Sequence, residues 1–380
     1  MLSFSWTDYP EIYDDKEKAR QIEIEAVEKT EGPHLFIEGD NYPVLLKLGT
    51  EMAEKIDFIY IDPPYNTGKS FTYDDSFSVN QDIHSAWLSF MSRRLRAAKL
   101  LLKKSGCIFI AIDQSELYTL KLLCDQIFGE DNFVNDFMWL HGKGKKDRWS
   151  RTLQQHTLCY ACDKSQLKPF KESMQTSWAK KNVDNDPRGN WFSGSISFTE
   201  KRSNPKHKNF YSITSPSGLV WTRQWMVSQS EMKELIAQKR IFWGAAPDYN
   251  KVPRIKIFNE EDEEVIPRNI IENVESTRAA QRHLDKLLGE KGAFDNPKPV
   301  SLITHLLKIS CMPKDAIVMD FFAGSGTTFE AVCALNAQDS GQRRCILVQK
   351  DENGIADICR RRCQRTAEQY GTEINFSSLL

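Results

Sequence analysis

The residues with the clearest chemical potential are Asp62, Pro63, Pro64 and Tyr65, which follow the apolar run Ile56–Ile61. Two successive prolines fix φ and stiffen the turn, so they hold a carboxylate, a carbonyl and an aromatic ring in a fixed relation. An exocyclic amine offers two N–H donors, which the Asp62 carboxylate and the Pro63 carbonyl can accept while the Tyr65 ring stacks on a planar base. The turn therefore predicts a site for the amine of a nucleobase. The alternative interpretation is an ordinary turn at the end of a strand.

A second motif runs from Asp320 through Phe322, Gly324 and Gly326 to Thr327, between a predicted strand and a predicted helix. Glycines let the backbone approach a ligand closely, and a helix N-terminus favours an anionic group. Phe329 stands where the dinucleotide fingerprint has its third small residue, which argues against NAD. The loop instead predicts a smaller nucleoside ligand whose carboxylate meets the start of the helix.

Two patterns that resemble chemical motifs fail on inspection. Gly68-Lys69-Ser70 has the end of a phosphate-binding loop, but Pro63 stands where the earlier glycine is required. Cys159 and Cys162 have metal-ligand spacing, but on a strand they point to opposite faces, and no second pair completes a zinc site. The nine cysteines are scattered along the chain, which favours reduced thiols over a disulfide framework and predicts no metal centre.

Short apolar runs that alternate with helical patterns must position these motifs. This alternation predicts an open, doubly wound α/β fold with a seven-stranded, mostly parallel sheet. The predicted strands are His34–Glu38, Ile56–Asp62, Gly106–Asp113, Asn135–Leu140, Thr157–Cys162, Ala316–Phe321 and Cys345–Gln349. The predicted helices are Asn41–Lys55, Asp82–Lys104, Gln114–Phe128, Lys298–Ser310, Ser325–Gln338 and Glu352–Glu368.

The alternation breaks between about residues 164 and 294, where we predict an inserted domain; residues 1–163 and 295–380 then build one sheet from both ends of the chain. The chain as a whole carries a net charge of −1, but Lys164–Phe258 holds 17 Lys and Arg against 7 Asp and Glu. Five of the nine tryptophans also lie there. Cations for phosphates and flat rings for stacking are typical of a nucleic-acid surface. The alternative is a solvated domain face.

The paired motifs resemble the amino-methyltransferases that act on DNA. The order of Asp-Pro-Pro-Tyr, basic insert and Phe-Ala-Gly-Ser-Gly-Thr is similar to that of their permuted β group. The stretch Asp62–Phe77, with Glu38–Asn41 before it, resembles the modification subunits of type III restriction–modification systems. The resemblance covers roughly residues 30–165 and 290–350. It implies a Rossmann-like, S-adenosylmethionine-dependent enzyme that flips adenine out of double-stranded DNA and methylates its N6 amine.

The resemblance also implies residue roles. Asp62, Pro63 and Tyr65, in the turn completed by Pro64, would hold the flipped adenine. The implied cofactor site contains Asp40 near the cofactor adenine, Lys298 near its carboxylate, and Asp320, Phe322, Gly324, Gly326 and Thr327 in the glycine loop. The strand after this loop often ends in a carboxylate that binds the ribose. Here Gln349 stands at that place, with Asp351 as the alternative. Lys298 is alternatively a simple helix start beside proline.

Several functional interpretations remain open at this stage. The insert would be a target-recognition domain. The chain is either a site-specific DNA methyltransferase or mainly the recognition module of a restriction complex that contains a separate nuclease–helicase subunit. Cytosine N4 and RNA are alternative targets, although the cytosine enzymes more often carry Ser before Pro-Pro-Tyr. A homodimer is a family expectation. With no apolar run of membrane length and no secretory signal pattern, we expect a cytoplasmic protein, associated with the nucleoid of a prokaryote or with phage DNA.

Overall fold

The computed structural model describes residues 4–6, 34–67, 82–140, 149–173, 182–258 and 264–379. The segment Gly68-Lys69-Ser70 and Trp178 lie outside these residues. The chain divides into two compact units, one formed by Met1–Lys171 with Ile266–Leu380 and the other by Glu172–Val265. The first unit is thus assembled from both ends of the chain.

A nine-stranded sheet forms the centre of the first unit, in the order β13-β4-β5-β3-β2-β14-β15-β1-β16. Its strands are β1 (His34–Glu38), β2 (Ile56–Ile61), β3 (Leu102–Ile112), β4 (Phe133–Leu140), β5 (Gln154–Ala161), β13 (Ile270–Ile271), β14 (Ile317–Asp320), β15 (Arg344–Gln349) and β16 (Asn375–Ser378). β5 is antiparallel to β3 and β4, whereas the other neighbouring strands pair in parallel.

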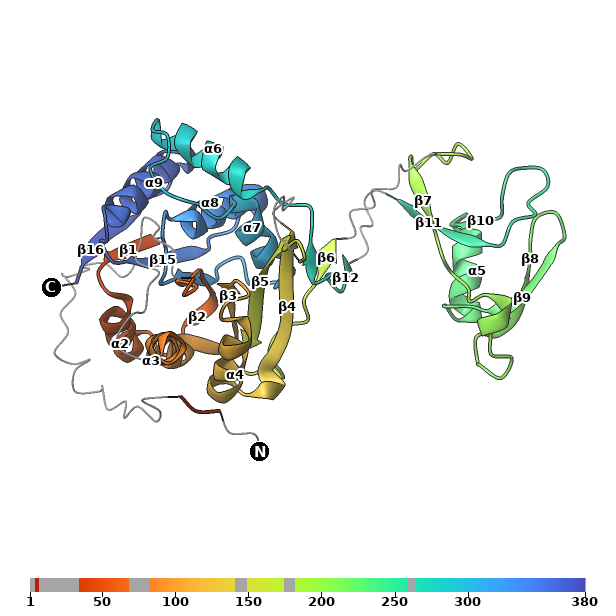
Figure 1. Ribbon diagram of the computed structural model, residues 1–380. Helices are drawn as coiled ribbons and strands as arrows, with labels where there is room; N and C mark the ends of the chain where they lie inside the picture. Colours follow the sequence, from red (N-terminus) through yellow and green to blue (C-terminus); the bar gives the residue numbers. More distant parts are fainter. Residues whose placement is uncertain are drawn as a thin grey trace. The chain divides into compact units, whose positions relative to one another are not determined.

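Helices cover both faces of this sheet (Figure 1). They are α2 (Asn41–Glu51), α3 (Ile83–Leu101), α4 (Leu117–Phe128), α6 (Thr277–Leu288), α7 (Val300–Ile309), α8 (Thr327–Asp339) and α9 (Ile355–Tyr370), with a 3-10 turn at Glu130–Asn132. Side chains of β2 alternate between two hydrophobic cores. Ile59 and Ile61 pack with α2, α3 and α4, and Phe58 and Tyr60 pack with α7, α8 and α9. Burial on both faces explains why the strands read as nearly continuous apolar runs.

The predicted α/β class is confirmed, and each of the seven predicted strands is present. The structure adds β13 and β16 at the two edges of the sheet. β13 has two residues, too few to create a period in the sequence, and β16 reads Asn-Phe-Ser-Ser, with one large apolar residue. Their pairing depends on the neighbouring strands β4 and β1, which a local pattern does not reveal.

The second unit has its own small core. It contains β6 (Glu172–Ser173), β7 (Trp191–Gly194), β8 (Phe210–Thr214), β9 (Val220–Gln224), α5 (Gln229–Ala237), β10 (Ile241–Phe242), β11 (Arg254–Phe258), β12 (Glu264–Val265) and a 3-10 turn at Glu200–Arg202. A capping box between Ser228 and Glu231 starts α5. This unit is narrower than the predicted insert of residues 164–294, because residues 266–294 contribute β13 and α6 to the first unit.

Three tryptophans of the basic segment are core residues. Trp191, Trp225 and Trp243 are each at most 7% exposed. The indole N–H of Trp225 donates to the Tyr211 carbonyl at 2.8 Å, and that of Trp191 donates to Asp184 at 2.9 Å. The expectation that the tryptophans offer flat rings to nucleic acid is therefore wrong for these three, which stabilise the fold of the unit instead.

Most of the nine cysteines are buried in the structure. All nine are free, and seven are buried, including Cys159, Cys359 and Cys363. Within the described part of the chain, no group of three or more His, Cys, Asp or Glu is arranged to hold a metal ion. Among the same residues, no helix has both the length and the apolar character needed to cross a membrane.

Candidate active site

The two chemical motifs meet at the carboxyl ends of adjacent parallel strands. β2 and β14 pair with Phe58 opposite Val318 and Ile59 opposite Met319, so the chain leaves both strands at the same edge of the sheet. Ligands of such sheets bind beyond this edge. A cavity of about 450 Å³ lies there. Among the predicted site residues, those that line it are Asp40, Asp62, Pro64, Tyr65, Lys298, Phe322, Gly324, Thr327 and Gln349. Pro63, Asp320 and Gly326 are not among the lining residues.

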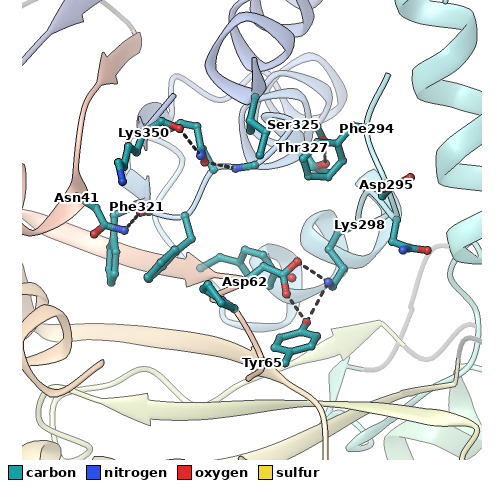
Figure 2. A pocket seen from close by; sticks show the side chains of 18 of the residues that line it. Asn41, Asp62, Tyr65, Phe294, Asp295, Lys298, Phe321, Ser325, Thr327 and Lys350 are labelled. Carbon is teal, nitrogen blue, oxygen red and sulfur yellow. Dashed lines mark hydrogen bonds and ion pairs between the residues drawn. The ribbon is translucent and has the colours of Figure 1, made fainter. Parts of the chain in front are cut away.

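Asp62, Tyr65 and Lys298 point toward one another at one end of the cavity (Figure 2). The Tyr65 hydroxyl donates to one carboxylate oxygen of Asp62, and the Lys298 ammonium donates to the other. Lys298 also donates to the Tyr65 hydroxyl oxygen at 3.1 Å. The side chains of Lys298 and Asp62 are 11% and 28% exposed, so water screens this ion pair only partly. The resemblance implied a cofactor contact for Lys298, and the structure brings it to the aspartate of the turn.

Residues outside the cavity hold the turn that carries Asp62 and Tyr65. The indole N–H of Trp87, on α3, donates to the Pro64 carbonyl at 2.7 Å. Asn66 directly follows Tyr65 and has a left-handed backbone with φ of 59°. Its side-chain amide donates to the Ile83 carbonyl at 3.1 Å and to Glu116 at 2.6 Å. The rigidity that the two prolines predict is thus reinforced from α3 and from the β3–α4 loop.

The glycine loop forms the opposite wall. Gly324 has φ of 53°, and a Cβ atom there would approach the Phe294 ring to 3.3 Å. Gly326 has φ of 83°, and a Cβ there would lie 3.1 Å from the Cys359 sulfur. Both positions therefore favour glycine on conformational and steric grounds. Gly326 itself does not line the cavity, and it lets the chain turn directly into α8.

Asp320 lies beneath the loop rather than on the cavity wall. It is 3% exposed and accepts hydrogen bonds from the Phe322 N–H at 3.0 Å and the Thr328 hydroxyl at 2.5 Å. Burial raises the pKa of the Asp320 carboxyl to about 7, although these two hydrogen bonds act in the opposite direction. Its contribution is to shape the loop from behind.

A buried ion pair supports the loop from α9. Arg362 is 1% exposed; it donates to Glu330 at 2.9 Å, to the Ser325 hydroxyl at 2.9 Å and to the Thr327 hydroxyl at 2.7 Å. Burial would raise the pKa of the Glu330 carboxyl, but a hydrogen bond from His283 and the charge of Arg362 outweigh it, so the net shift is downward. Both loop hydroxyls are therefore held by a fixed charge pair.

Asp40 belongs to a polar cluster at the far end of the cavity. Its carboxylate caps α2 through the Tyr42 N–H at 2.8 Å and pairs with Arg94 at 3.2 Å. The Arg94 guanidinium lies 3.6 Å from the centre of the Phe90 ring, and Phe90 lies 6.0 Å from Phe322. Burial lowers the pKa of Arg94 to about 10, against the charge of Asp40. This end therefore combines aromatic walls with an aspartate whose position is fixed.

The strand after the glycine loop presents Gln349 to the cavity. The Gln349 side-chain oxygen accepts from the Gly324 N–H at 2.7 Å, and its amide donates to the Lys350 carbonyl at 2.8 Å. Asp351 instead accepts from the Ala356 N–H at 3.2 Å near the start of α9 and is not among the lining residues. Glu352, paired with Lys350 at 2.9 Å, is the carboxylate on this wall.

Several lining residues escaped the sequence interpretation. Trp139 and Gln155 face each other across the antiparallel pair β4–β5, and the Gln155 amide donates to the Tyr65 hydroxyl. Phe294 also lines the cavity and lies beside Gly324 of the glycine loop, although it is the last residue of the predicted insert. None belongs to a local motif. The pairing register of β4 and β5 would have placed Trp139 beside Gln155, whereas no signal in the sequence marks Phe294.

Comparison with known proteins agrees with this geometry. The sequence model of a family described as DNA methylase matches residues 56–375, which include both motifs. The chain belongs to this DNA methylase family. The match spans the second unit as well as most of the sheet, so the family relation concerns the arrangement of the whole chain and not a single motif.

Three curated relatives extend the comparison. The type III restriction-modification enzyme StyLTI Mod subunit of Salmonella typhimurium is 35% identical over 390 residues, which cover 91% of this chain and 59% of that protein. The EcoPI Mod subunit of Escherichia phage P1 is 34% identical over 86% of this chain and 58% of its own length. The type II methyltransferase M.KpnI of Klebsiella pneumoniae is 32% identical over 82% of this chain and 79% of its own length. The chain thus spans about three fifths of the two Mod subunits.

The pKa of Asp320 leads to a prediction about stability. A carboxyl whose pKa is raised in the folded state contributes stability below its ordinary pKa, and this contribution is lost as the pH rises through the folded value of about 7. The stability advantage of the native protein over Asp320→Asn should therefore shrink by about 2–4 kcal/mol between pH 5 and pH 8. Urea unfolding of both proteins across this range measures it, and parallel stability curves would contradict it.

Proposed function

We propose that this DNA methylase transfers a methyl group from S-adenosylmethionine to the N6 amine of adenine in double-stranded DNA. The observation that carries the proposal is the shared cavity, in which the Asp62 carboxylate and the Tyr65 ring face a glycine loop across a space of about 450 Å³. An amine-binding turn and a nucleoside-binding loop in one cavity suit transfer between two bound ligands. Asp rather than Ser before Pro-Pro-Tyr favours adenine over cytosine, by the family resemblance.

The residues that line the cavity suit S-adenosylmethionine in three respects. Gly324 lines the cavity without a Cβ, so the backbone of the glycine loop can approach a ligand closely. Phe322 and Phe90 offer apolar walls beside the fixed Asp40 carboxylate. Lys350 and Glu352 offer a charge of each sign at the end of β15. S-adenosylmethionine, when bound, supplies an electrophilic methyl group carried on a sulfonium.

The work of the protein's own residues follows from the substrate. The N6 lone pair of adenine is delocalised into the ring, so the amine is a poor nucleophile. Asp62 accepts one N6–H, the Pro63 carbonyl accepts the other, and both hydrogen bonds favour a tetrahedral nitrogen with a localised lone pair. Tyr65 stacks on the base, which leaves the duplex at a cost of a few kcal/mol. No cysteine nucleophile is required, and the extra proton of the methylated amine leaves by way of Asp62 to water.

Lys298 has a specific place in this mechanism. Its ammonium contacts both the Asp62 carboxylate and the Tyr65 hydroxyl, the two side chains assigned to the base. A fixed cation beside the carboxylate keeps that acceptor in one orientation, and a preorganised arrangement of this kind lowers the reorganisation needed at the transition state. We therefore assign Lys298 to the target-base end of the cavity.

The second unit is proposed to recognise the target sequence. The 3-10 turn at Glu200–Arg202 and the segment that follows it expose four cations within eight residues: Lys201, Arg202, Lys206 and Lys208. Exposed cations so close together suit contacts to DNA phosphates, which set the position of a protein on the duplex. Lys256 is excluded from such a role, since it is 5% exposed and pairs with Asp184 and Asp186.

The names of the relatives suggest the biological setting. StyLTI and EcoPI are named as Mod subunits of type III restriction-modification enzymes. We propose that this chain likewise modifies the sites of a restriction–modification system in the cytoplasm, as a homodimer, and that a separate subunit carries out cleavage. The second candidate function is a recognition subunit that methylates only when this partner is present.

Nucleoside mass spectrometry tests the proposed function. Unmethylated genomic DNA incubated with the purified protein and S-adenosylmethionine should yield N6-methyladenine after digestion. N4-methylcytosine would retain the mechanism and overturn the proposed base. Methylation that appears only after a nuclease subunit is added would favour the second candidate, and a methylated base formed only in RNA would overturn DNA as the substrate.

The role of Asp62 gives a second prediction. Asp62→Ala should lower single-turnover methylation by about 100-fold or more, because it removes an acceptor of the reacting amine. Its affinity for S-adenosylmethionine, measured by calorimetry, should stay close to that of the native protein. Asp113→Ala is the matched control, since Asp113 follows the neighbouring strand and bonds to Ser115 of its own loop. Near-normal turnover in Asp62→Ala would refute the role.

Lys298 gives a third prediction that separates its two assignments. Lys298→Met should lower kcat by about tenfold or more while the cofactor Kd changes little, since the ammonium acts on Asp62 and Tyr65. Lys308→Met is the control, because Lys308 is an exposed lysine in the last turn of α7, the helix that begins just after Lys298. A raised cofactor Kd with an unchanged kcat would show that Lys298 serves the cofactor carboxylate instead.

A further inference from the structure

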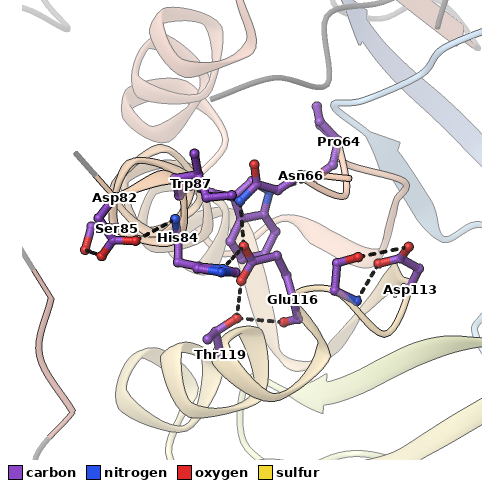
Figure 3. Close-up of polar contacts among 11 residues, drawn as sticks. Pro64, Asn66, Asp82, His84, Ser85, Trp87, Asp113, Glu116 and Thr119 are labelled. Carbon is purple, nitrogen blue, oxygen red and sulfur yellow. Dashed lines mark hydrogen bonds and ion pairs between the residues drawn. The ribbon is translucent and has the colours of Figure 1, made fainter. Parts of the chain in front are cut away.

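A buried carboxylate lies outside the cavity, behind the turn from Asp62 to Tyr65, which is called the catalytic turn below. Glu116, in the loop between β3 and α4, is 0% exposed. Its carboxylate accepts hydrogen bonds from the Asn66 amide at 2.6 Å, from the His84 ring at 2.6 Å and from the Thr119 hydroxyl (Figure 3). A buried carboxylate is costly unless its lone pairs are satisfied. The three donors come from three different segments, so Glu116 joins segments that the sequence keeps apart.

Asn66 is the donor that links this carboxylate to the site. It directly follows Tyr65, and its φ of 59° lies in the left-handed region, which Asn tolerates better than most residues. Two acceptors, Glu116 and the Ile83 carbonyl, hold its side-chain amide. A fixed amide fixes the backbone at Asn66, and hence the direction in which the chain leaves Tyr65.

The other supports of the turn come from one helix. Trp87, on α3, holds the Pro64 carbonyl at 2.7 Å, and Ile83 is the first residue of the same helix. Glu116 belongs instead to the loop between β3 and α4, directly before Leu117, the first residue of α4. Its contact with Asn66 therefore ties the turn to the start of α4, a support that is separate from those given by Trp87 and Ile83.

We propose that Glu116 is a positioning residue for the catalytic turn. By holding Asn66, it sets the direction of the Tyr65 ring and the place of the Asp62 carboxylate relative to the base. The proposal rests on the proposed function. Misplacement of a reacting group by 1 Å can lower a rate by about 100-fold, so a residue with no access to substrate can have a large effect on turnover.

The chain offers variants that separate positioning from stability. Glu116→Gln can keep the three contacts, because its side-chain oxygen accepts from Asn66 and His84 while its amide donates to the Thr119 hydroxyl, which can also accept. Glu116→Leu removes them all at similar volume. Asn66→Gly keeps the left-handed backbone but deletes the amide. Thr119→Val removes one contact of Glu116 and leaves Asn66 untouched.

Single-turnover methylation, cofactor Kd and melting temperature of these variants test the proposal. Glu116→Leu and Asn66→Gly should each lower turnover by about 10- to 100-fold with the cofactor Kd within about twofold of native, because the glycine loop is unaffected. The double variant should be no worse than either single one, since both act through one contact. Glu116→Gln should recover most of the rate, and Thr119→Val should be near native.

A base-stacking signal adds a readout that a purely structural role would not change. With 2-aminopurine at the target position, the native protein should quench the fluorescence of the flipped base by stacking on Tyr65. Folded Glu116→Leu and Asn66→Gly should leave it brighter. If Glu116→Leu fails to fold, Asn66→Gly carries the test alone.

Three results would overturn the positioning role. They are native turnover in folded Glu116→Leu or Asn66→Gly, additive losses in the double variant, and a loss in Thr119→Val equal to that in Asn66→Gly. A native protein that methylates no base would instead overturn the proposed function, so the two failures are distinguishable.

Discussion

The pairing of β2 with β14 is the constraint on which the rest of the site depends. These strands lie about 260 residues apart in the sequence, yet Phe58 opposes Val318 in a parallel register. At the entrance to the pair, the buried Asp57 accepts from Lys103 at 2.7 Å and from the Ile317 N–H at 2.9 Å, which joins three neighbouring strands. Because the register is fixed there, the turn after β2 and the loop after β14 must emerge side by side. The cavity exists because both strands end at the same edge.

Much of this arrangement could be predicted from the sequence, because it depends on local patterns of residues. The runs that become β2 and β14 are apolar on both faces. Each is followed within a few residues by types that a regular element does not tolerate: two prolines after β2, and glycines with positive φ after β14. In both places a hydrophobic pattern, a residue that ends the strand and a chemically distinctive side chain occur together. The sequence then predicts both the strand and the end of the strand that carries the site.

The rest depends on contacts between distant segments. Nothing near Lys298 in the sequence indicates that its ammonium reaches Asp62, and nothing near Gln349 indicates that its side-chain oxygen accepts from the Gly324 N–H. For Trp191 and Trp225, the sequence pattern suggested a ligand contact that the structure does not offer. Tryptophans in a basic segment resemble a stacking surface, but these two are buried and stabilise the second unit by packing. Composition shows which side chains are present, and only tertiary structure shows which of them are already engaged.

Both halves of the site are supported by buried carboxylates that do not line the cavity. Glu330 holds the glycine loop through Arg362, and Glu116 holds the turn from Asp62 to Tyr65 through Asn66. Each carboxylate is buried and oriented by several donors, so its position does not depend on what occupies the cavity. Burial of such groups is costly, and an apolar side chain would often stabilise the fold equally well. Their presence behind both turns is best explained by the geometry they impose, since the proposed transfer between two bound ligands requires that the turn and the loop keep their separation throughout the reaction.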